Sequence, residues 1–350
     1  MLGPAAATDL HFGVAVGIDR YPNVSGAADL QFARRDAESF HGWLLDPEGG
    51  GLPAENAELL KGKRLSQYPT QKEVYAALRR WHEAVGGIEP GSAEWERTRL
   101  YVYGAGHGYG PTDGTAALLL ADANDQELGC HLEVQSYLEW LKINAPFKEV
   151  LLFADCCRRR YEKGPPSSRP PYSYTSPNPQ VEVFSIAGYA ARRNEVALEP
   201  VDPTDADDAR GVFTRAVLDG LRGSAASGGV VTSQSLATYV RSAVENRTKQ
   251  SRVPQKVEFT ADLAQEISIC SPQGPAPVRN VTLRFPATAR GEAVIKNGSF
   301  EIVERKRIGP GVAWTVQLED GFYALDFGED SGGFRPQTFG LVGEDISVDA

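Results

Sequence analysis

Residues 151–157 read Leu151-Leu152-Phe153-Ala154-Asp155-Cys156-Cys157, an apolar run that ends in an acidic residue and two cysteines. A second run, Tyr101-Val102-Tyr103-Gly104-Ala105-Gly106-His107-Gly108, ends in a glycine-rich turn around a histidine. Short apolar runs bounded by turn residues are typical of buried strands. In an open α/β sheet, catalytic side chains collect at the carboxyl ends of the strands. The two runs therefore predict two strands, with His107 just past the end of one and Cys157 just past the end of the other.

Apolar strands alternate with helical patterns on both sides of these two runs. Residues 12–18 form another apolar run that predicts a buried strand. Thr70, with Glu73 at the capping-box position, predicts the start of an amphipathic helix. This alternation predicts an α/β fold, in which helices flank a mostly parallel sheet. The other expected elements of this region are strands at 57–60 and 181–186 and helices at 30–44, 134–141, 212–221 and 236–244.

Two proline-rich segments interrupt the alternation. Residues 158–180 contain six prolines and several serines, which predicts an exposed loop. Residues 271–277 predict a linker between a domain at 1–270 and a second domain at 278–350. After this linker the apolar pattern has a period of two, which predicts a small all-β, sandwich-like domain. Its expected strands are residues 278–285, 292–295, 300–303, 313–318 and 321–327.

Composition narrows the function classes. The chain has 350 residues and a formal net charge of -10, which argues against general binding to nucleic acids or anionic membranes. Four cysteines are too few and too scattered for a disulfide framework, and the pair Cys156-Cys157 lacks the C-x-x-C spacing of a zinc site. From this spacing we expect no structural metal. Neither a signal peptide nor a membrane-spanning run is recognisable, so we expect a cytoplasmic protein.

A thiol nucleophile needs a base within hydrogen-bonding reach, and that base normally comes from elsewhere in the sequence. His107 precedes Cys157 by 50 residues, which is the separation typical of caspases. Glycines beside His107 also allow a backbone N–H to face a developing oxyanion. The pair therefore predicts thiol-dependent acyl transfer.

On these residues the chain resembles the caspase and metacaspase superfamily of cysteine peptidases, in particular its bacterial members. Gly106-His107-Gly108 matches the family's G-H-G turn, and Asp155-Cys156-Cys157 matches its D-x-C motif. The resemblance extends over about residues 12–270 and implies a caspase-like peptidase domain. Further matches, in the order the family has them, are Gly17-Ile18-Asp19-Arg20-Tyr21, Asp36-Ala37, Leu118-Leu119-Leu120-Ala121-Asp122 and Gly211-Val212-Phe213-Thr214.

The resemblance implies a role for five residues. Cys157 would attack the peptide carbonyl, and His107 would transfer the proton to the leaving amine. The backbone N–H groups of Gly108 and Cys157 would bind the oxyanion. Asp155 and Asp36 would select Arg or Lys at P1, since paired carboxylates suit a guanidinium. The expected function is a cysteine endopeptidase of a bacterial stress, defence or cell-death pathway.

The chain departs from the family pattern just before the turn that contains His107 and just after Cys157. Ala105 stands where many members have serine, and arginines follow Cys157 where a Ser-Gly pair is common. These arginines begin the proline-rich loop, and its basic side chains are expected to block the acidic P1 pocket until an upstream protease, or another copy, cuts there. A basic loop that is merely solvated explains the same residues about equally well. The candidate residues for this cleavage are Arg158, Arg159, Arg160, Lys163 and Arg169.

Several alternatives stay open at the sequence level. Cys156 is expected to be a buried packing residue, because neighbours on an extended chain point to opposite faces. Asp36 is almost as well explained by a place on a helix surface. The acidic run 202–208 is a candidate calcium site by resemblance to some metacaspases, although its spacing matches no defined calcium loop. A competing function is a catalytically weak scaffold that recruits partners through the β-domain.

Overall fold

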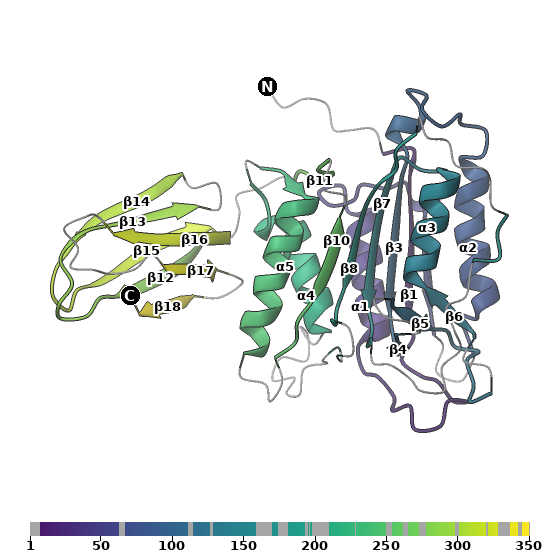
Figure 1. Ribbon diagram of the computed structural model, residues 1–350, viewed down its shortest axis with the longest axis horizontal. Helices are drawn as coiled ribbons and strands as arrows, with labels where there is room; N and C mark the ends of the chain where they lie inside the picture. The colour runs from purple at the N-terminus through teal and green to yellow at the C-terminus, as the bar shows by residue number, and fades with distance from the viewer. Residues whose placement is uncertain are drawn as a thin grey trace. The chain divides into compact units, whose positions relative to one another are not determined.

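The chain divides into two compact units in the computed structural model (Figure 1). One contains Met1–Leu218 with Arg247–Ile267, and the other contains Asp219–Asn246 with Ser268–Ala350. The residues that the structure describes are 8–62, 67–110, 115–126, 129–158, 170–173, 181–192, 195, 197, 210–227, 229–249, 254–261, 265–272, 278–297, 301–319, 321–327, 337–341 and 345–349.

The first unit is built on a six-stranded sheet in the order β10-β8-β7-β3-β1-β2. The five strands other than β10 run parallel, and β10 pairs antiparallel with β8 at one edge. The prediction of a mostly parallel sheet is therefore confirmed. The strands are β1 (His11–Gly17), β2 (Ala57–Lys61), β3 (Arg99–Ala105), β7 (Glu149–Asp155), β8 (Phe184–Tyr189) and β10 (Glu258–Ala261).

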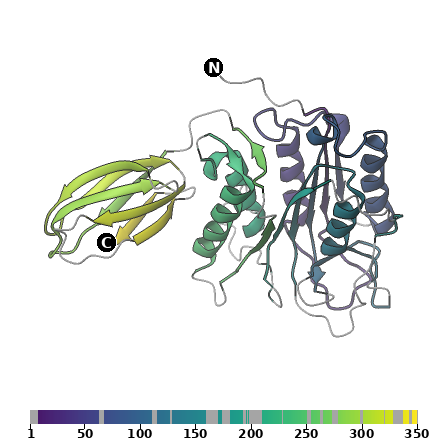
Figure 2. The same cartoon turned by 45° about the horizontal axis from the view of Figure 1, so that its top comes forward.

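Helices cover both faces of this sheet (Figures 1 and 2). Alternate residues of β1 face opposite ways, as strand geometry requires. Gly17 leaves room for α1, because a Cβ there would lie 2.7 Å from the Cβ of Ala37. Val14 belongs instead to the core that also contains Leu78 of α2. The helices of this unit are α1 (Ala33–Leu45), α2 (Gln71–Ala84), α3 (Val134–Asn144) and α4 (Val212–Asp219).

The start of α2 confirms the predicted capping box. Thr70 accepts a hydrogen bond from the backbone N–H of Glu73, and the Glu73 carboxylate accepts one from the backbone N–H of Thr70 at 2.7 Å. Both bonds satisfy N–H groups that the first helical turn leaves without intrahelical partners.

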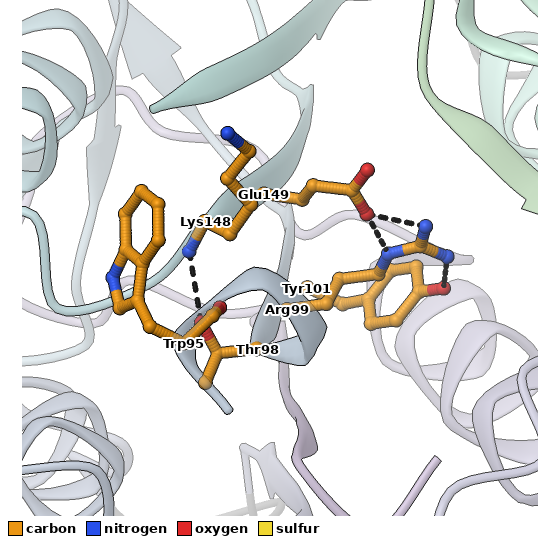
Figure 3. A network of polar contacts seen from close by, with 6 residues as sticks. All are labelled: Trp95, Thr98, Arg99, Tyr101, Lys148 and Glu149. Atoms are coloured by element: carbon orange, nitrogen blue, oxygen red, sulfur yellow. Dashed lines mark hydrogen bonds and ion pairs between the residues drawn. The ribbon is translucent and has the colours of Figure 1, made fainter. Parts of the chain in front are cut away.

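A polar network fixes the register of β3 against β7 at the amino ends of the two strands (Figure 3). Arg99 pairs in register with Glu149, and its Nε donates to the Glu149 carboxylate at 2.7 Å. The same guanidinium donates to the Tyr101 hydroxyl at 3.1 Å, while the backbone N–H of Lys148 donates to Thr98 at 2.9 Å. Because register is kept along a ladder, this network also fixes which residues face each other at the far ends of the strands.

A small sheet that the sequence did not predict follows His107. It consists of β4 (Gly108–Tyr109), β5 (Ala117–Leu119) and β6 (His131–Glu133). Strands of two or three residues are too short to show a period of two, so no pattern in the sequence indicates them.

The second unit contains β9 (Val231–Thr232), most of α5 (Ser233–Thr248), β11 (Ser268–Cys270) and the C-terminal strands. The C-terminal strands form two sheets, β15-β12-β18 and β14-β13-β16-β17, around a core of their own. The expected all-β region is confirmed, but the strand predicted at 300–303 begins later, and β17 and β18 were not predicted. The observed strands are β12 (Val278–Arg284), β13 (Gly291–Asn297), β14 (Ile302–Ile308), β15 (Ala313–Glu319), β16 (Gly321–Phe327), β17 (Gln337–Leu341) and β18 (Ile346–Asp349).

The prediction that residues 158–180 form an exposed loop holds only in part for their described residues. None of these lies in a helix or strand, and Pro171 and Ser173 are exposed, but the others are not. Arg158 and Pro170 are buried. Tyr172 donates its hydroxyl proton to the carbonyl of Tyr75 at 2.7 Å, and its ring lies 4.9 Å from that of His82. An aromatic side chain that buries most of its area in this way outweighs the local preference of proline and serine for solvent. The linker predicted at 271–277 lies mostly outside the described residues.

No helix within the described part of the chain is long and apolar enough to cross a membrane.

Candidate active site

His107 and Cys157 lie at equivalent positions beyond two neighbouring parallel strands. Ala105, the last residue of β3, pairs with Asp155, the last residue of β7. The backbone N–H of Gly106 then donates to the carbonyl of Asp155 at 3.2 Å, so the two chains stay together beyond the sheet. His107 and Cys157 each follow the paired residues by two positions. Adjacent strands are about 5 Å apart, so this register brings the two turns to one place.

Cys156 fills the space between these two turns. A Cβ on Gly108 would lie 2.6 Å from the sulfur of Cys156, so only glycine fits beside this buried side chain. Burial raises the pKa of the Cys156 thiol, and the neighbouring Cys157 and Asp155 raise it further. Cys156 therefore remains a protonated packing residue, whereas Cys157 is only partly buried.

A backbone carbonyl orients the His107 ring. Its Nε2 lies 2.8 Å from the carbonyl oxygen of Ala28. A carbonyl oxygen only accepts, so we assign the imidazole proton to Nε2. In the neutral ring, Nδ1 is then the atom that accepts a proton from another group.

Tyr21 also supports His107, a role that the sequence did not indicate. The backbone N–H of His107 donates to the Tyr21 hydroxyl at 3.0 Å, and this hydroxyl donates to the carbonyl of Leu119 at 3.1 Å. The two rings lie 5.1 Å apart. Burial raises the pKa of Tyr21 well above its usual value, which keeps the hydroxyl protonated and able to donate. Tyr21 lies within the family-like run at residues 17–21, but the resemblance assigned it no task.

The structure brings Asp36 and Asp155 together beside Gly211. A Cβ on Gly211 would lie 2.7 Å from an Asp155 oxygen and 2.8 Å from an Asp36 oxygen. Asp36 is only 2% exposed and accepts from the backbone N–H of Gly211 at 3.0 Å. Asp155 accepts from the Thr214 hydroxyl at 2.6 Å and from its backbone N–H at 3.3 Å. The structure therefore brings the two acidic residues together, and the pair also stabilises the start of α4.

Of the basic residues expected to block the acidic pair, the structure describes Arg158, and its partners differ from that expectation. Arg158 does not contact Asp36 or Asp155 through any hydrogen bond or ion pair that the described residues show. Its guanidinium donates to Glu258 at 2.8 Å and to the carbonyl of Ala191 at 3.2 Å. The expectation that Arg158 blocks the acidic pair is not met in this structure, because the partly exposed carboxylate of Glu258 pairs with its guanidinium instead. The remaining candidates, Arg159, Arg160, Lys163 and Arg169, lie outside the described residues.

A metal site would need several histidine, cysteine or acidic ligands close together among the described residues. No cluster of three or more histidine, cysteine or acidic side chains in them is arranged to hold a metal ion. The calcium candidate at 202–208 lies outside the described part of the chain.

Comparisons with known proteins bear on the fold. No known family model matches the chain. A curated protein from a Desulfuromonadales bacterium, named "Probable protease", is 24% identical over 233 residues, which is 61% of this chain. The alignment spans 26% of that protein's own length. The crystal structure of caspase-1 from Spodoptera frugiperda superposes with a TM-score of 0.51 at 12% identity, over 78% of this chain and 94% of that chain. The chain therefore has a caspase-like fold, with His107 and Cys157 beyond the ends of neighbouring strands of its central sheet.

Proposed function

We propose that the chain is a cysteine endopeptidase in which Cys157 is the nucleophile and His107 is the base. The observation that carries this proposal is the β3–β7 register, which places both residues two positions beyond paired strand ends. The similarity to a protein named as a protease and the caspase-like fold support the same reaction class.

The orientation of His107 supports a specific path for the proton. Nδ1 takes the proton of the Cys157 thiol, and the sulfur then attacks the carbonyl carbon of the peptide. The protonated ring returns the proton to the leaving nitrogen as the C–N bond breaks and a thioester forms. His107 next removes a proton from water, whose oxygen attacks the thioester and regenerates the thiol. The carbonyl of Ala28 keeps the ring oriented by accepting from Nε2 throughout.

The backbone N–H groups of Gly108 and Cys157 are proposed to bind the oxyanion that forms on the carbonyl. Gly108 directly follows the base, and its contact with Cys156 keeps the two turns close. Both donors belong to the backbone and are held by neighbouring strands, so they need little rearrangement when negative charge develops.

The proposed specificity is for Arg or Lys at P1. Asp36 and Asp155 lie on the same side of Gly211, and Asp155 precedes Cys157 by two residues. A guanidinium or ammonium group is attracted to two carboxylates, whereas a P1 aspartate would be repelled by them. The backbone N–H of Gly211 and the Thr214 hydroxyl occupy oxygens of this pair, so a bound substrate would share the carboxylates with α4.

Protein substrates, action in the cytoplasm and a role in bacterial stress, defence or cell death remain parts of this proposal. Activation by a cut in the loop after Cys157 also remains a proposal, now limited to Arg159, Arg160, Lys163 and Arg169. Sequencing the fragments of the Cys157→Ala protein after incubation with active protein would test this activation. The absence of fragments that end at these residues would contradict it.

Fluorogenic peptides that differ only at P1 test the main proposal. We expect the wild-type protein to cleave Arg and Lys peptides far faster than the Asp peptide, and Cys157→Ala to cleave none. Equal hydrolysis by the two proteins would exclude Cys157 as the nucleophile, and preferential cleavage after Asp would exclude the proposed P1 site.

A further inference from the structure

β14 forms one edge of the four-stranded sheet β14-β13-β16-β17 (Figure 1). It pairs with β13 on one side, and no strand pairs with its other side among the residues that the structure describes. Every residue from Ile302 to Arg307 is exposed. A strand edge that presents its N–H and C=O groups to solvent can accept one further strand from another chain. β14 therefore offers a backbone surface on which an extended segment can pair.

β14 is also strongly cationic, in a chain whose formal net charge is -10. Arg305, Lys306 and Arg307 follow one another along it. In the described part of the chain none of these three side chains forms an ion pair, whereas Lys296 and Asp326 of the same sheet pair at 2.6 Å. A positive strand on an acidic protein attracts anionic groups that the remaining surface repels.

The neighbouring strand leaves most of this charge uncompensated. The register of β14 and β13 pairs Arg305 with Val294, Lys306 with Ala293, and Arg307 with Glu292. Arg305 and Lys306 therefore have no acidic residue opposite them on β13. Opposite charges that face each other across an antiparallel pair stabilise it. Acidic residues on a strand added at the open edge would supply these missing partners.

An apolar step precedes the cationic residues. Ile302 and Val303 are 49% and 40% exposed, and Val278 is the one other large apolar side chain that is exposed among the described residues. Covering apolar area is favourable. A strand that paired along β14 and placed apolar residues opposite Ile302 and Val303 would gain stability from this part of the edge as well.

The same charges disfavour a second copy of β14 as the occupant of the edge. Two identical strands would pair antiparallel around a two-fold axis, so the central residue of the pair would face its own copy. Any centre from Glu304 to Arg307 places two like charges directly opposite each other, which is destabilising. A centre at Val303 would pair only the start of the strand. A nucleic acid would match the cations, but it has no strand backbone to pair with the open edge.

We propose that the open edge of β14 binds an extended acidic segment of a partner protein, which adds a strand to the sheet β14-β13-β16-β17. In the antiparallel direction, three acidic residues of this segment face Arg307, Lys306 and Arg305. After one intervening residue, two apolar residues face Val303 and Ile302. Backbone hydrogen bonds supply affinity, and the charge pairs fix the register. This binding site is independent of the proposed Cys157–His107 dyad.

A labelled peptide that contains Asp-Glu-Asp-Thr-Val-Ile tests the proposal by fluorescence anisotropy. The full chain carries Cys157→Ala in every sample, so that no peptide is cleaved during the measurement. We expect saturable binding that weakens with added salt. Amide hydrogen exchange of β14 should slow when the peptide binds, because its outward N–H groups gain partners. A single-stranded DNA oligonucleotide of the same charge should bind more weakly.

The matched variants change the same charges at two places in the same region. Arg305→Glu with Arg307→Glu reverses two cations at the open edge, and we expect it to weaken binding by about tenfold or more. Arg279→Glu with Arg284→Glu makes the same change of charge on β12, which lies between β15 and β18 and has no open edge. This control should change the affinity by less than about twofold.

A charge-swapped peptide shows whether the edge variant is still folded. The peptide containing Lys-Glu-Lys-Thr-Val-Ile should bind the variant with Arg305→Glu and Arg307→Glu better than the acidic peptide does. No binding of the acidic peptide up to about 1 mM would overturn the proposal. Equal weakening in both double variants, or DNA binding as tight as peptide binding, would show a general attraction for anions. A dimer that only the edge variant abolishes would show that a second copy occupies the edge instead.

Discussion

Each residue of the candidate site has a physical reason to be where it is. The Ala28 carbonyl selects the His107 tautomer, and the buried Cys156 side chain requires glycine at position 108. Asp36 is buried on α1, and it is held by a backbone N–H of the segment before α4. A carboxyl group buried in this way serves the fold, because its oxygen accepts from that backbone N–H.

Asp36 provides a test of specificity at the residue scale. We expect Asp36→Asn to reduce the preference for an Arg-P1 peptide over the matching citrulline peptide by about tenfold, since citrulline has a similar shape but no charge. The ratio of kcat/KM for the two peptides, measured on the same protein sample, cancels any loss of folded protein. An unchanged ratio would show that Asp36 only supports α4.

The packing of α2 against α3 contains a histidine that links stability to pH. Nε2 of His82 lies 2.7 Å from the Tyr137 hydroxyl, and the His82 ring lies 4.6 Å from the Trp140 ring. Burial and, to a smaller extent, the positive charge of Arg79 lower the pKa of His82 from 6.5 to about 3. The unfolded chain therefore binds a proton below about pH 6.5 that the folded chain does not bind until about pH 3, so stability is lost as the pH falls through this window.

We expect the free energy of unfolding to fall more steeply with acid in the wild-type protein than in His82→Gln. The difference should approach about 1.4 kcal/mol per pH unit between about pH 6 and 5. Urea unfolding at several pH values measures both slopes. Parallel curves would mean that His82 is protonated in the folded protein.

Elements with strong local signals were predictable from the sequence. The strands β3 and β7 are long apolar runs, and α2 has its own capping box, so each is specified by residues close together in the chain. The small sheet after His107 was not predictable, because its strands are too short to show a period. The burial of Arg158 was not predictable for a different reason. Its partners Thr115, Ala191 and Glu258 are far from it in sequence, so no local pattern indicates that its charge is compensated.

At the scale of the whole molecule, the C-terminal strands have a core of their own. Among the described residues, this core is formed by side chains between Val281 and Leu341, with Ile346 and Val348 packed against it. Exposed Ile302 and Val303 lie on β14, an edge strand of the four-stranded sheet. The chain spans about a quarter of the length of the curated relative, so the full activity of that relative is no guide to what this region does.

We expect residues 278–350 to fold when expressed alone, because the core that their described residues show is formed by their own side chains. A dispersed amide spectrum and a cooperative unfolding transition would confirm this. The matched variant Leu283→Ala, which removes a fully buried side chain, should lower stability by about 2–5 kcal/mol. A fragment with no cooperative transition would show that this region depends on the rest of the chain.

We propose that Cys157 and His107 act as a catalytic dyad, in which His107 takes the thiol proton. The rate of alkylation at each cysteine measures this coupling. The wild-type, His107→Ala and Cys156→Ala proteins are treated briefly with iodoacetamide over a range of pH, and each cysteine is quantified by mass spectrometry. We predict that Cys157 reacts first, that it reacts at a lower pH than an ordinary thiol, and that His107→Ala removes this advantage while Cys156→Ala preserves it. Equal Cys157 reactivity in the wild-type and His107→Ala proteins, or faster labelling of Cys156 than of Cys157, would exclude the Cys157–His107 dyad.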